Sequence, residues 1–383
     1  MQSAVFGGNF AGDSPHKGDL EDMGKVGAFL KRKNVLFSAK RYGIDAMGAM
    51  AQGLFASLLI GTIIKTLGQQ LNVQFLIDAG NFAQQVAGPA MAVSIGAALS
   101  APQLVLYSLI AVGMAANKLG GAGGPLAVYF ITIVASECGK IVSKETKVDI
   151  LVTPAVTILV GVGLSVLCAP TIGAAASSVG DFIKWATNLQ PLLMGILVSV
   201  VVGMALTLPI SSAAICAALS LTGLAGGAAV AGCCAQMVGF AVMSFRENGV
   251  GGLVSQGLGT SMLQMPNIVK NPRVWIAPTV TSAITGPIAT CLFRLQMNGA
   301  AINSGMGTCG LCGQLGVWTG WVAPSEKALA NGAIAMNPTA FDWAGLILIS
   351  FILPAILCPL INQLCRKAGL SLIHISEPTR QAE

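Results

Sequence analysis

Residues 149–170 of this 383-residue chain read DILVTPAVTILVGVGLSVLCAP, and this stretch decides the fold. Asp149 is its one charged residue, and the apolar positions run on instead of alternating with polar ones, as they would in a barrel strand. About 20 apolar residues wound as an α-helix cross the hydrocarbon core of a bilayer. We therefore predict a membrane-spanning helix here.

The rest of the chain has the same character. It is 54% hydrophobic and only 9% charged, whereas a soluble domain carries about 25% charged residues, and its mean hydropathy is +0.75. The predicted spans are 43–67, 79–100, 102–117, 124–143, 149–170, 189–209, 212–234, a short 236–246, 275–296 and 343–364. We predict an all-α polytopic membrane protein with about ten transmembrane helices.

Two segments, residues 246–273 and 303–321, do not fit simple spans. Both are rich in glycine, too broken for one regular helix and too apolar for water. Irregular backbone at membrane depth is tolerated where protein or a water-filled cavity satisfies its polar groups. We predict two broken or re-entrant segments facing a cavity; ordinary surface loops are the alternative.

Basic residues predict the orientation and the domain limits. Residues 1–42 are expected to form a cytoplasmic tail and a basic interfacial helix, because Lys31-Arg32-Lys33 and Lys40-Arg41 precede the first span. Residues 43–369 form the predicted transmembrane domain, and Arg366-Lys367 place its end in the cytoplasm too. Residues 370–383 resemble the translation of a transposon-type sequencing adapter and are expected not to belong to the fold. The net charge of +6 is thus an orientation signal, and no nucleic-acid partner is expected.

Several chemistries are excluded by the residues at hand. The two histidines, His16 and His374, lie outside every predicted span, and no P-loop or HExxH sequence occurs. Most of the ten cysteines fall within apolar runs and are expected to be small buried side chains. Cys309 and Cys312 have CxxC spacing without a second such pair. We predict no metal and no cofactor.

Five short stretches resemble one family. They are KETKVDI (144–150), LQP (189–191), LPISSAA (208–214), SFRENG (244–249) and MLQMPN (262–267). The chain resembles a stand-alone membrane subunit, IIC, of the bacterial sugar phosphotransferase system, and in particular a divergent branch that also contains toxin-gene regulators. The resemblance implies a homodimer in the bacterial cytoplasmic membrane that binds a sugar in a polar cavity. Separate IIA-like and IIB-like phosphocarrier subunits would phosphorylate the sugar as it reaches the inside.

The family resemblance directs attention to Arg246, Glu247 and Asn248. They lie between an apolar run and the first glycine-rich segment. The resemblance implies a carboxylate, sometimes with a histidine, near the sugar. Because no predicted span contains a histidine, that role would fall to an acid, and Glu247 is the predicted general base. Asn248 could hydrogen-bond sugar hydroxyls, and Arg246 could pair with the carboxylate or an incoming phosphate. The alternative is an ion pair in an interfacial loop.

Other polar residues at membrane depth are weaker candidates for solute binding. Glu137 ends a predicted span and could instead simply pair with Lys140 on one helix face. Asn267 follows Pro266, which breaks a helix and frees backbone groups. The further candidates are Ser211 and Ser212, which could equally mediate helix packing, and Gln236 and Asn303.

Three functions remain open from the sequence. The leading hypothesis is a permease for a sugar or sugar-like solute, coupled to phosphorylation by a separate subunit. The second is a membrane sensor or regulator that has kept the carrier fold without phosphotransfer. The third is an ion-coupled carrier that uses Glu137 or Glu247 as a proton site.

Overall fold

The computed structural model describes residues 25–367, and this part of the chain is almost wholly helical. It contains no β-strand, and one β-bridge joins Gly223 to Met297. Six helical stretches in it are long and apolar enough to cross a membrane: Arg41–Leu71, Gln103–Val142, Asp149–Ala186, Gly223–Met243, Pro272–Leu292 and Ala340–Lys367. Two shorter apolar helices are α5 (Ala87–Ala98) and α9 (Pro191–Thr207). The predicted all-α polytopic membrane fold is confirmed.

The first stretch folds against the helices that follow it. It consists of two short π-helical segments and two α-helices: η2 (Arg41–Asp45), α2 (Ala46–Leu54), η3 (Phe55–Leu59) and α3 (Ile60–Leu71). The predicted span 79–100 is α4 (Gln74–Gln85) followed by α5, and it runs back antiparallel. A Cβ on Gly53 would lie 2.6 Å from the Ala90 oxygen, and one on Gly68 would lie 2.7 Å from the Ile77 nitrogen. Glycines thus let the backbones touch, as is common between membrane helices.

Next come α6 (Gln103–Gly120), the 3₁₀ turn η4 (Gly121–Gly123) and α7 (Gly124–Val142). The chain reverses at Gly121, whose φ of 51° and ψ of −120° suit a residue without a side chain. Helices α6 and α7 therefore form an antiparallel pair, and α8 (Asp149–Ala186) packs along both. We call α2 to α7, with the start of α8, the first group.

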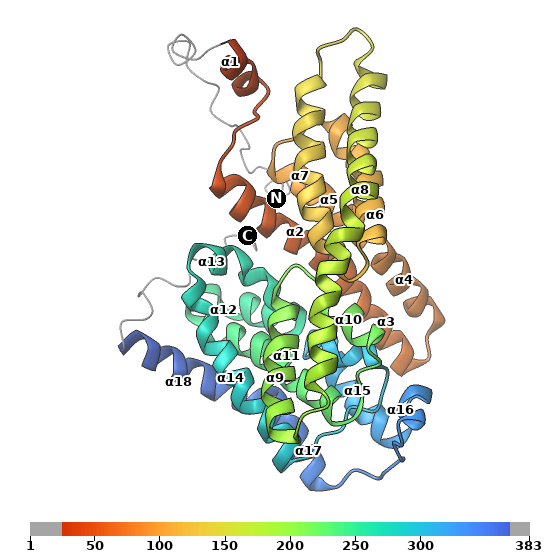
Figure 1. Ribbon diagram of the computed structural model, residues 1–383, viewed down its shortest axis with the longest axis vertical. Helices are drawn as coiled ribbons and strands as arrows, with labels where there is room; N and C mark the ends of the chain where they lie inside the picture. Colours follow the sequence, from red (N-terminus) through yellow and green to blue (C-terminus); the bar gives the residue numbers. More distant parts are fainter. Residues whose placement is uncertain (1–24, 368–383) are drawn as a thin grey trace, which may run out of the picture.

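Helix α8 is much longer than its predicted span. Its 38 residues extend for about 57 Å at 1.5 Å per residue. The helix continues past Pro170 because its second half packs on the elements that follow. A Cβ on Gly180 would lie 3.5 Å from Ile215 Cγ2, and Ile183 is buried. In Figure 1, α8 accordingly runs from the first group toward α9, α10 and α11.

The second group contains α9, α10 (Ser212–Ala218), α11 (Gly223–Met243) and α14 (Ile276–Pro287). The predicted spans 212–234 and 236–246 were wrong in their limits. Ser220 and Gly223 have positive φ and interrupt the helix, whereas Gln236 does not interrupt it, because its amide is hydrogen-bonded inside the group. The hydrogen bonds between them show that α9 and α11 are parallel, whereas α9 and α14 are antiparallel.

Both segments predicted to be broken are broken. The first contains α12 (Phe245–Val254), η5 (Ser255–Gly259), η6 (Ser261–Gln264), α13 (Met265–Lys270) and η7 (Pro272–Trp275). The second contains η9 (Ala301–Gly305), η10 (Cys309–Leu311) and α15 (Cys312–Val322). The Thr308 hydroxyl donates a hydrogen bond to the Gly257 oxygen. The two segments, 51 residues apart in sequence at that bond, therefore meet.

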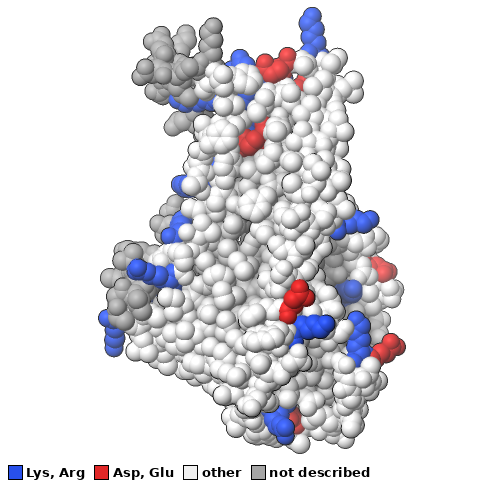
Figure 2. All heavy atoms as spheres, in the orientation of Figure 1, with Lys and Arg blue, Asp and Glu red and all other residues white. Residues whose placement is uncertain are grey.

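The remaining elements precede the first spanning stretch, continue α14, or follow the second broken segment. They are α1 (Lys25–Arg32), η8 (Ile288–Leu292), α16 (Glu326–Ala330), α17 (Ala340–Ile347), η11 (Leu348–Ile352) and α18 (Leu353–Lys367). In Figure 2, most charged side chains lie at the ends and flanks of the face, a red and blue pair lies within its lower half, and wide uncharged areas separate them. On α8, Leu159 and Leu167 are 73% and 74% exposed. Such a surface is compatible with lipid contact.

Candidate functional site

A chain of hydrogen-bonded side chains runs through the first broken segment. Asn267 Nδ2 donates to Gln264 Oε1 at 2.8 Å, and Gln264 Nε2 donates to Gln256 Oε1 at 2.8 Å. Gln256 Nε2 in turn donates to Ser244 Oγ at 3.1 Å. All four residues are buried. We call these four residues the amide chain; each amide can both donate and accept, as sugar hydroxyls do.

The backbone breaks bring these side chains together. The π-helical segment η5 ends at Gly259, and Thr260 then caps η6, its Oγ1 accepting from the Met262 nitrogen at 3.1 Å. Pro266 lies in the first turn of α13, where the missing N–H of proline has no cost. A regular helix would place residues 256, 264 and 267 on different turns of one face. The three short helices instead bend the segment so that these side chains bond in sequence.

A second buried polar cluster surrounds Gln236, in the middle of α11. Gln236 Oε1 accepts hydrogen bonds from Thr207 Oγ1 at 3.3 Å and from Trp275 Nε1 at 3.0 Å. Gln236 Nε2 lies 3.5 Å from Ser282 Oγ, and Thr207 Oγ1 lies 2.8 Å from Ser261 Oγ. We call these five residues the Gln236 cluster. It ties the first broken segment to α9, α11 and α14.

The first helical stretch and the second broken segment lie against this region. A Cβ on Gly259 would lie 2.3 Å from Phe55 Cε2, so the ring of Phe55 covers that glycine. Thr66 Oγ1 lies 3.4 Å from Cys312 Sγ. Segment η3 and helix α3 of the first group thus border both broken segments.

The residues predicted from the sequence are distributed over several places. Asn267 belongs to the amide chain and Gln236 to the cluster named after it. Arg246 and Glu247 are exposed on the first turn of α12, and Asn248 is half-buried beside them. Because Ser244 ends the amide chain two residues before Arg246, this polar group adjoins one end of the chain.

The other predicted residues lie away from the amide chain. Ser211 caps α10 by accepting from the Ala214 nitrogen at 3.2 Å, and Ser212 Oγ donates to the Gly305 oxygen at 2.8 Å. Asn303 belongs to η9 and packs beside Gly316. Glu137 lies in the first group, where its Oε2 is 2.7 Å from Lys140 Nζ.

Sequence reasoning missed seven members of these two clusters: Ser244, Gln256, Gln264, Thr207, Ser261, Trp275 and Ser282. Gln264 lies three residues before the predicted Asn267, and both glutamines fall inside a segment predicted to be broken. An amide within such a segment was therefore an available signal. Thr207 and Trp275 carried no comparable signal, since a hydroxyl or an indole near a span end is common.

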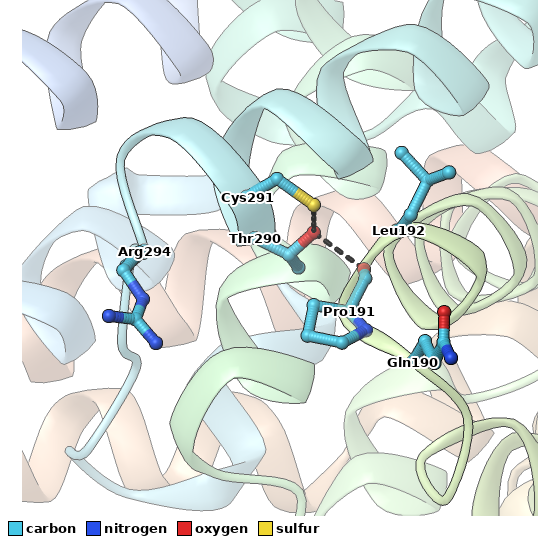
Figure 3. A pocket seen from close by; sticks show the side chains of 6 residues that line it. All are labelled: Gln190, Pro191, Leu192, Thr290, Cys291 and Arg294. Carbon is cyan, nitrogen blue, oxygen red and sulfur yellow. Dashed lines mark hydrogen bonds between the residues drawn. The ribbon is translucent and has the colours of Figure 1, made fainter.

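The described residues contain no group of metal ligands, and a surface hollow lies apart from the two clusters. Between residues 25 and 367, no three Cys, His, Asp or Glu side chains gather in a way that could hold a metal ion. A surface hollow of about 410 Å³ is lined by Gln190, Pro191, Leu192, Thr290, Cys291 and Arg294 (Figure 3). In it, Thr290 Oγ1 donates to the Pro191 oxygen at 2.8 Å. None of its lining residues belongs to the amide chain or the Gln236 cluster.

Comparison with known proteins identifies the family. No curated protein and no solved structure matches the chain. The family model described as "Phosphotransferase system, EIIC" matches residues 44–373, which is well over half of the 383 residues. The chain therefore belongs to the EIIC family of the phosphotransferase system.

Proposed function

We propose that this chain binds a neutral sugar or sugar-like solute at the amide chain and the adjoining Gln236 cluster. The observation that supports it most is the amide chain itself, which places three buried amides in a row inside a broken segment. Sugars are recognised by groups that donate and accept hydrogen bonds. Neither cluster contains a charged side chain, which favours an uncharged solute.

The helix directions support a cytoplasmic position for Arg246 and Glu247. Gln314 Nε2 bonds both Cys234 Sγ, at 3.2 Å, and Ser350 Oγ, at 2.9 Å. Farther along both helices, a Cβ on Gly239 would lie 3.0 Å from Cys358 Sγ. Helices α11 and α18 therefore run the same way and end on the same side. Because α18 ends at the basic pair Arg366-Lys367, we place that side in the cytoplasm.

The exposed group at the start of α12 is the proposed place of phosphotransfer. A separate phosphocarrier subunit would approach from the cytoplasm, and Arg246 would pair with its phosphoryl group. Glu247 would accept the proton of the hydroxyl that attacks phosphorus. Exposure of Arg246 and Glu247 suits contact with a soluble partner. The amide chain, which ends at Ser244, would hold the solute nearby.

Solute binding is tested by thermal shift on purified protein with a panel of neutral sugars, sugar acids and amino sugars. We expect a neutral sugar to raise the Tm of the wild type and to have little effect on Gln264→Leu. Gln84→Leu is the matched control, because Gln84 Nε2 donates only to Thr62 Oγ1, in the first group. Equal stabilisation of wild type and Gln264→Leu would refute the site.

Phosphotransfer is tested separately in vesicles supplied with phosphorylated carrier proteins. We expect Glu247→Gln to lower product formation at least tenfold while the Tm shift on sugar binding persists. Loss of sugar binding in Glu247→Gln would instead make Glu247 part of the binding site. Full product formation by the variant would remove Glu247 from the chemistry.

A sensor without phosphotransfer is the second candidate. This candidate is favoured because residues 25–367 contain no histidine that could take part in phosphotransfer. The two histidines of the chain, His16 and His374, lie outside that range. A sensor would bind sugar yet yield no phosphorylated product with any carrier pair. Uptake that follows a pH gradient without a phosphorylated product would point to the ion-coupled carrier. The homodimer stays a prediction, and cross-linking in native membranes tests it.

A further inference from the structure

Helix α7, in the first group, bears a stripe of buried polar side chains. Tyr129, Thr132, Ser136 and Lys140 follow at intervals of three and four residues, so they share one face of the helix. Glu137 borders that face. Thr132 and Ser136 are 0% exposed and Glu137 is 8% exposed. These polar groups lie in a part of the molecule that the proposed sugar site does not use.

The two hydroxyls on this stripe differ from others in the bundle. Many buried serines and threonines donate to the carbonyl four residues earlier, as Thr62, Thr157 and Ser165 do at 2.7–2.8 Å. Thr132 Oγ1 and Ser136 Oγ make no hydrogen bond to any side chain or backbone group of residues 25–367. A buried hydroxyl left in this way is rare, because it loses its bonds to water on folding.

Two more polar groups, the Tyr42 phenol and the Glu137 carboxylate, lie beside or on α7. Tyr129 donates its hydroxyl to the Tyr42 carbonyl at 2.5 Å, which fixes Tyr42 beside α7. The Tyr42 hydroxyl has the Glu137 carboxylate as its hydrogen-bond partner. The hydroxyls of Thr132 and Ser136 are therefore the two groups of this stripe that have no partner within residues 25–367.

The charges around these hydroxyls indicate what their ligand is. The Glu137 carboxylate is paired with Lys140, whose Nζ also donates to the carbonyls of Asn34 at 2.9 Å and Leu99 at 3.1 Å. Arg41 is the next cation, and it bonds Asn34 Oδ1 at 2.9 Å. The single negative charge is already balanced, so a further cation would be repelled. A small neutral molecule that both donates and accepts fits best.

We propose that Thr132 and Ser136 bind internal water beside the Tyr42–Glu137 pair. Water would accept a hydrogen bond from each of the two hydroxyls, which supplies the bonds that these groups lack. The bound water would also lower the cost of burying the Glu137–Lys140 pair. The bound water then lies along α7, beside the Glu137–Lys140 pair.

Thermal unfolding of Thr132→Val tests the proposal, since valine keeps the shape of threonine without its hydroxyl. We expect Thr132→Val to lower the Tm by several degrees, because a bound water loses a partner. The control is Thr157→Val, whose hydroxyl bonds only its own helix at Thr153 O, and we expect little change there. A higher Tm for Thr132→Val would mean that the hydroxyl has no partner and would overturn the proposal.

X-ray radiolytic labelling gives a second readout, because side chains next to bound water are oxidised even when buried. We expect Tyr42 to be labelled in the wild type and severalfold less in the double variant Thr132→Val with Ser136→Ala. Equal labelling in both would overturn the proposal. A second outcome would also overturn the proposal. If sodium chloride, but not choline chloride, raised the Tm of the wild type and not that of the double variant, the site would belong to a cation.

Discussion

Replacing Gln236 by leucine should destabilise the protein mainly because the Trp275 indole loses its hydrogen-bond acceptor, while the other members of the Gln236 cluster keep a partner. Thr207 keeps Ser261 Oγ at 2.8 Å, and Ser282 Oγ still donates to the Pro278 oxygen at 2.9 Å. Trp275 Nε1, in contrast, loses the acceptor 3.0 Å away. A buried donor without a partner costs about 1–3 kcal/mol. We expect Gln236→Leu to lower the free energy of unfolding by about that amount.

A double-mutant cycle isolates this bond. Gln236→Leu, Trp275→Phe and the double variant are unfolded reversibly in sodium dodecyl sulfate from mixed micelles and followed by circular dichroism. If the bond matters, the double variant is more stable than the sum of the single effects predicts, by about 1 kcal/mol. This is within the range of up to about 1.7 kcal/mol measured for hydrogen bonds between membrane helices. Additivity within about 0.3–0.5 kcal/mol would refute the reasoning.

Three further predictions follow from close contacts and one surface ion pair. Gly232→Val should prevent folding, because a Cβ there would lie 1.8 Å from the Ser199 oxygen. Gly163→Val should fold, because a Cβ there would meet no neighbouring atom within 4 Å. Fluorescence-detected size-exclusion chromatography compares the two variants. Gly259→Ala should lower the Tm because its Cβ meets Phe55, and Phe55→Ala should restore part of the loss. The Lys33 hydrogen bond lowers the pKa of Glu145, so the contact of α1 with the α7–α8 loop is complete at neutral pH. This contact is lost as the pH falls through the lowered pKa of Glu145, and amide hydrogen exchange of residues 25–33 should then become faster. The variant Glu145→Gln should show the faster exchange at every pH.

The spans and their breaks could be predicted from sequence because lipid and backbone geometry constrain each residue locally. Residues 149–170 are helical because an apolar run of that length has no other stable form in a bilayer. The clustered glycines and Pro266 likewise predicted breaks that the structure contains. The beginning of α8 could be predicted from the sequence in this way, but its end could not. Its extension past Pro170 depends on packing against α10, which no local pattern reveals.

The site was only partly predictable because its bonds join distant segments. Asn267 and Gln236 were predicted from polarity within apolar surroundings, and both are hydrogen-bonded as buried amides. Thr207 meets Ser261 across 54 residues of sequence, a pairing that depends on helix directions that no local pattern specifies. Sequence proximity also grouped Asn248 with Arg246 and Glu247, although burial separates the half-buried amide from its exposed neighbours.

The distribution of charge has a consequence for selectivity. Around the broken segments the buried polar groups are amides and hydroxyls, which can be buried at modest cost when bonded. The buried ion pair, Glu137 with Lys140, lies in the first group. A charged solute would lose its bound water on entering the amide chain, and no opposite charge there would compensate for that loss. A neutral solute would exchange its hydrogen bonds to water for hydrogen bonds to the amides at nearly equal energy. Introducing a lysine as Gln264→Lys should therefore not merely weaken neutral-sugar binding. It should shift the preference toward sugar acids, and a variant that still binds neutral sugars as tightly as the wild type would show that the amide chain only supports the fold.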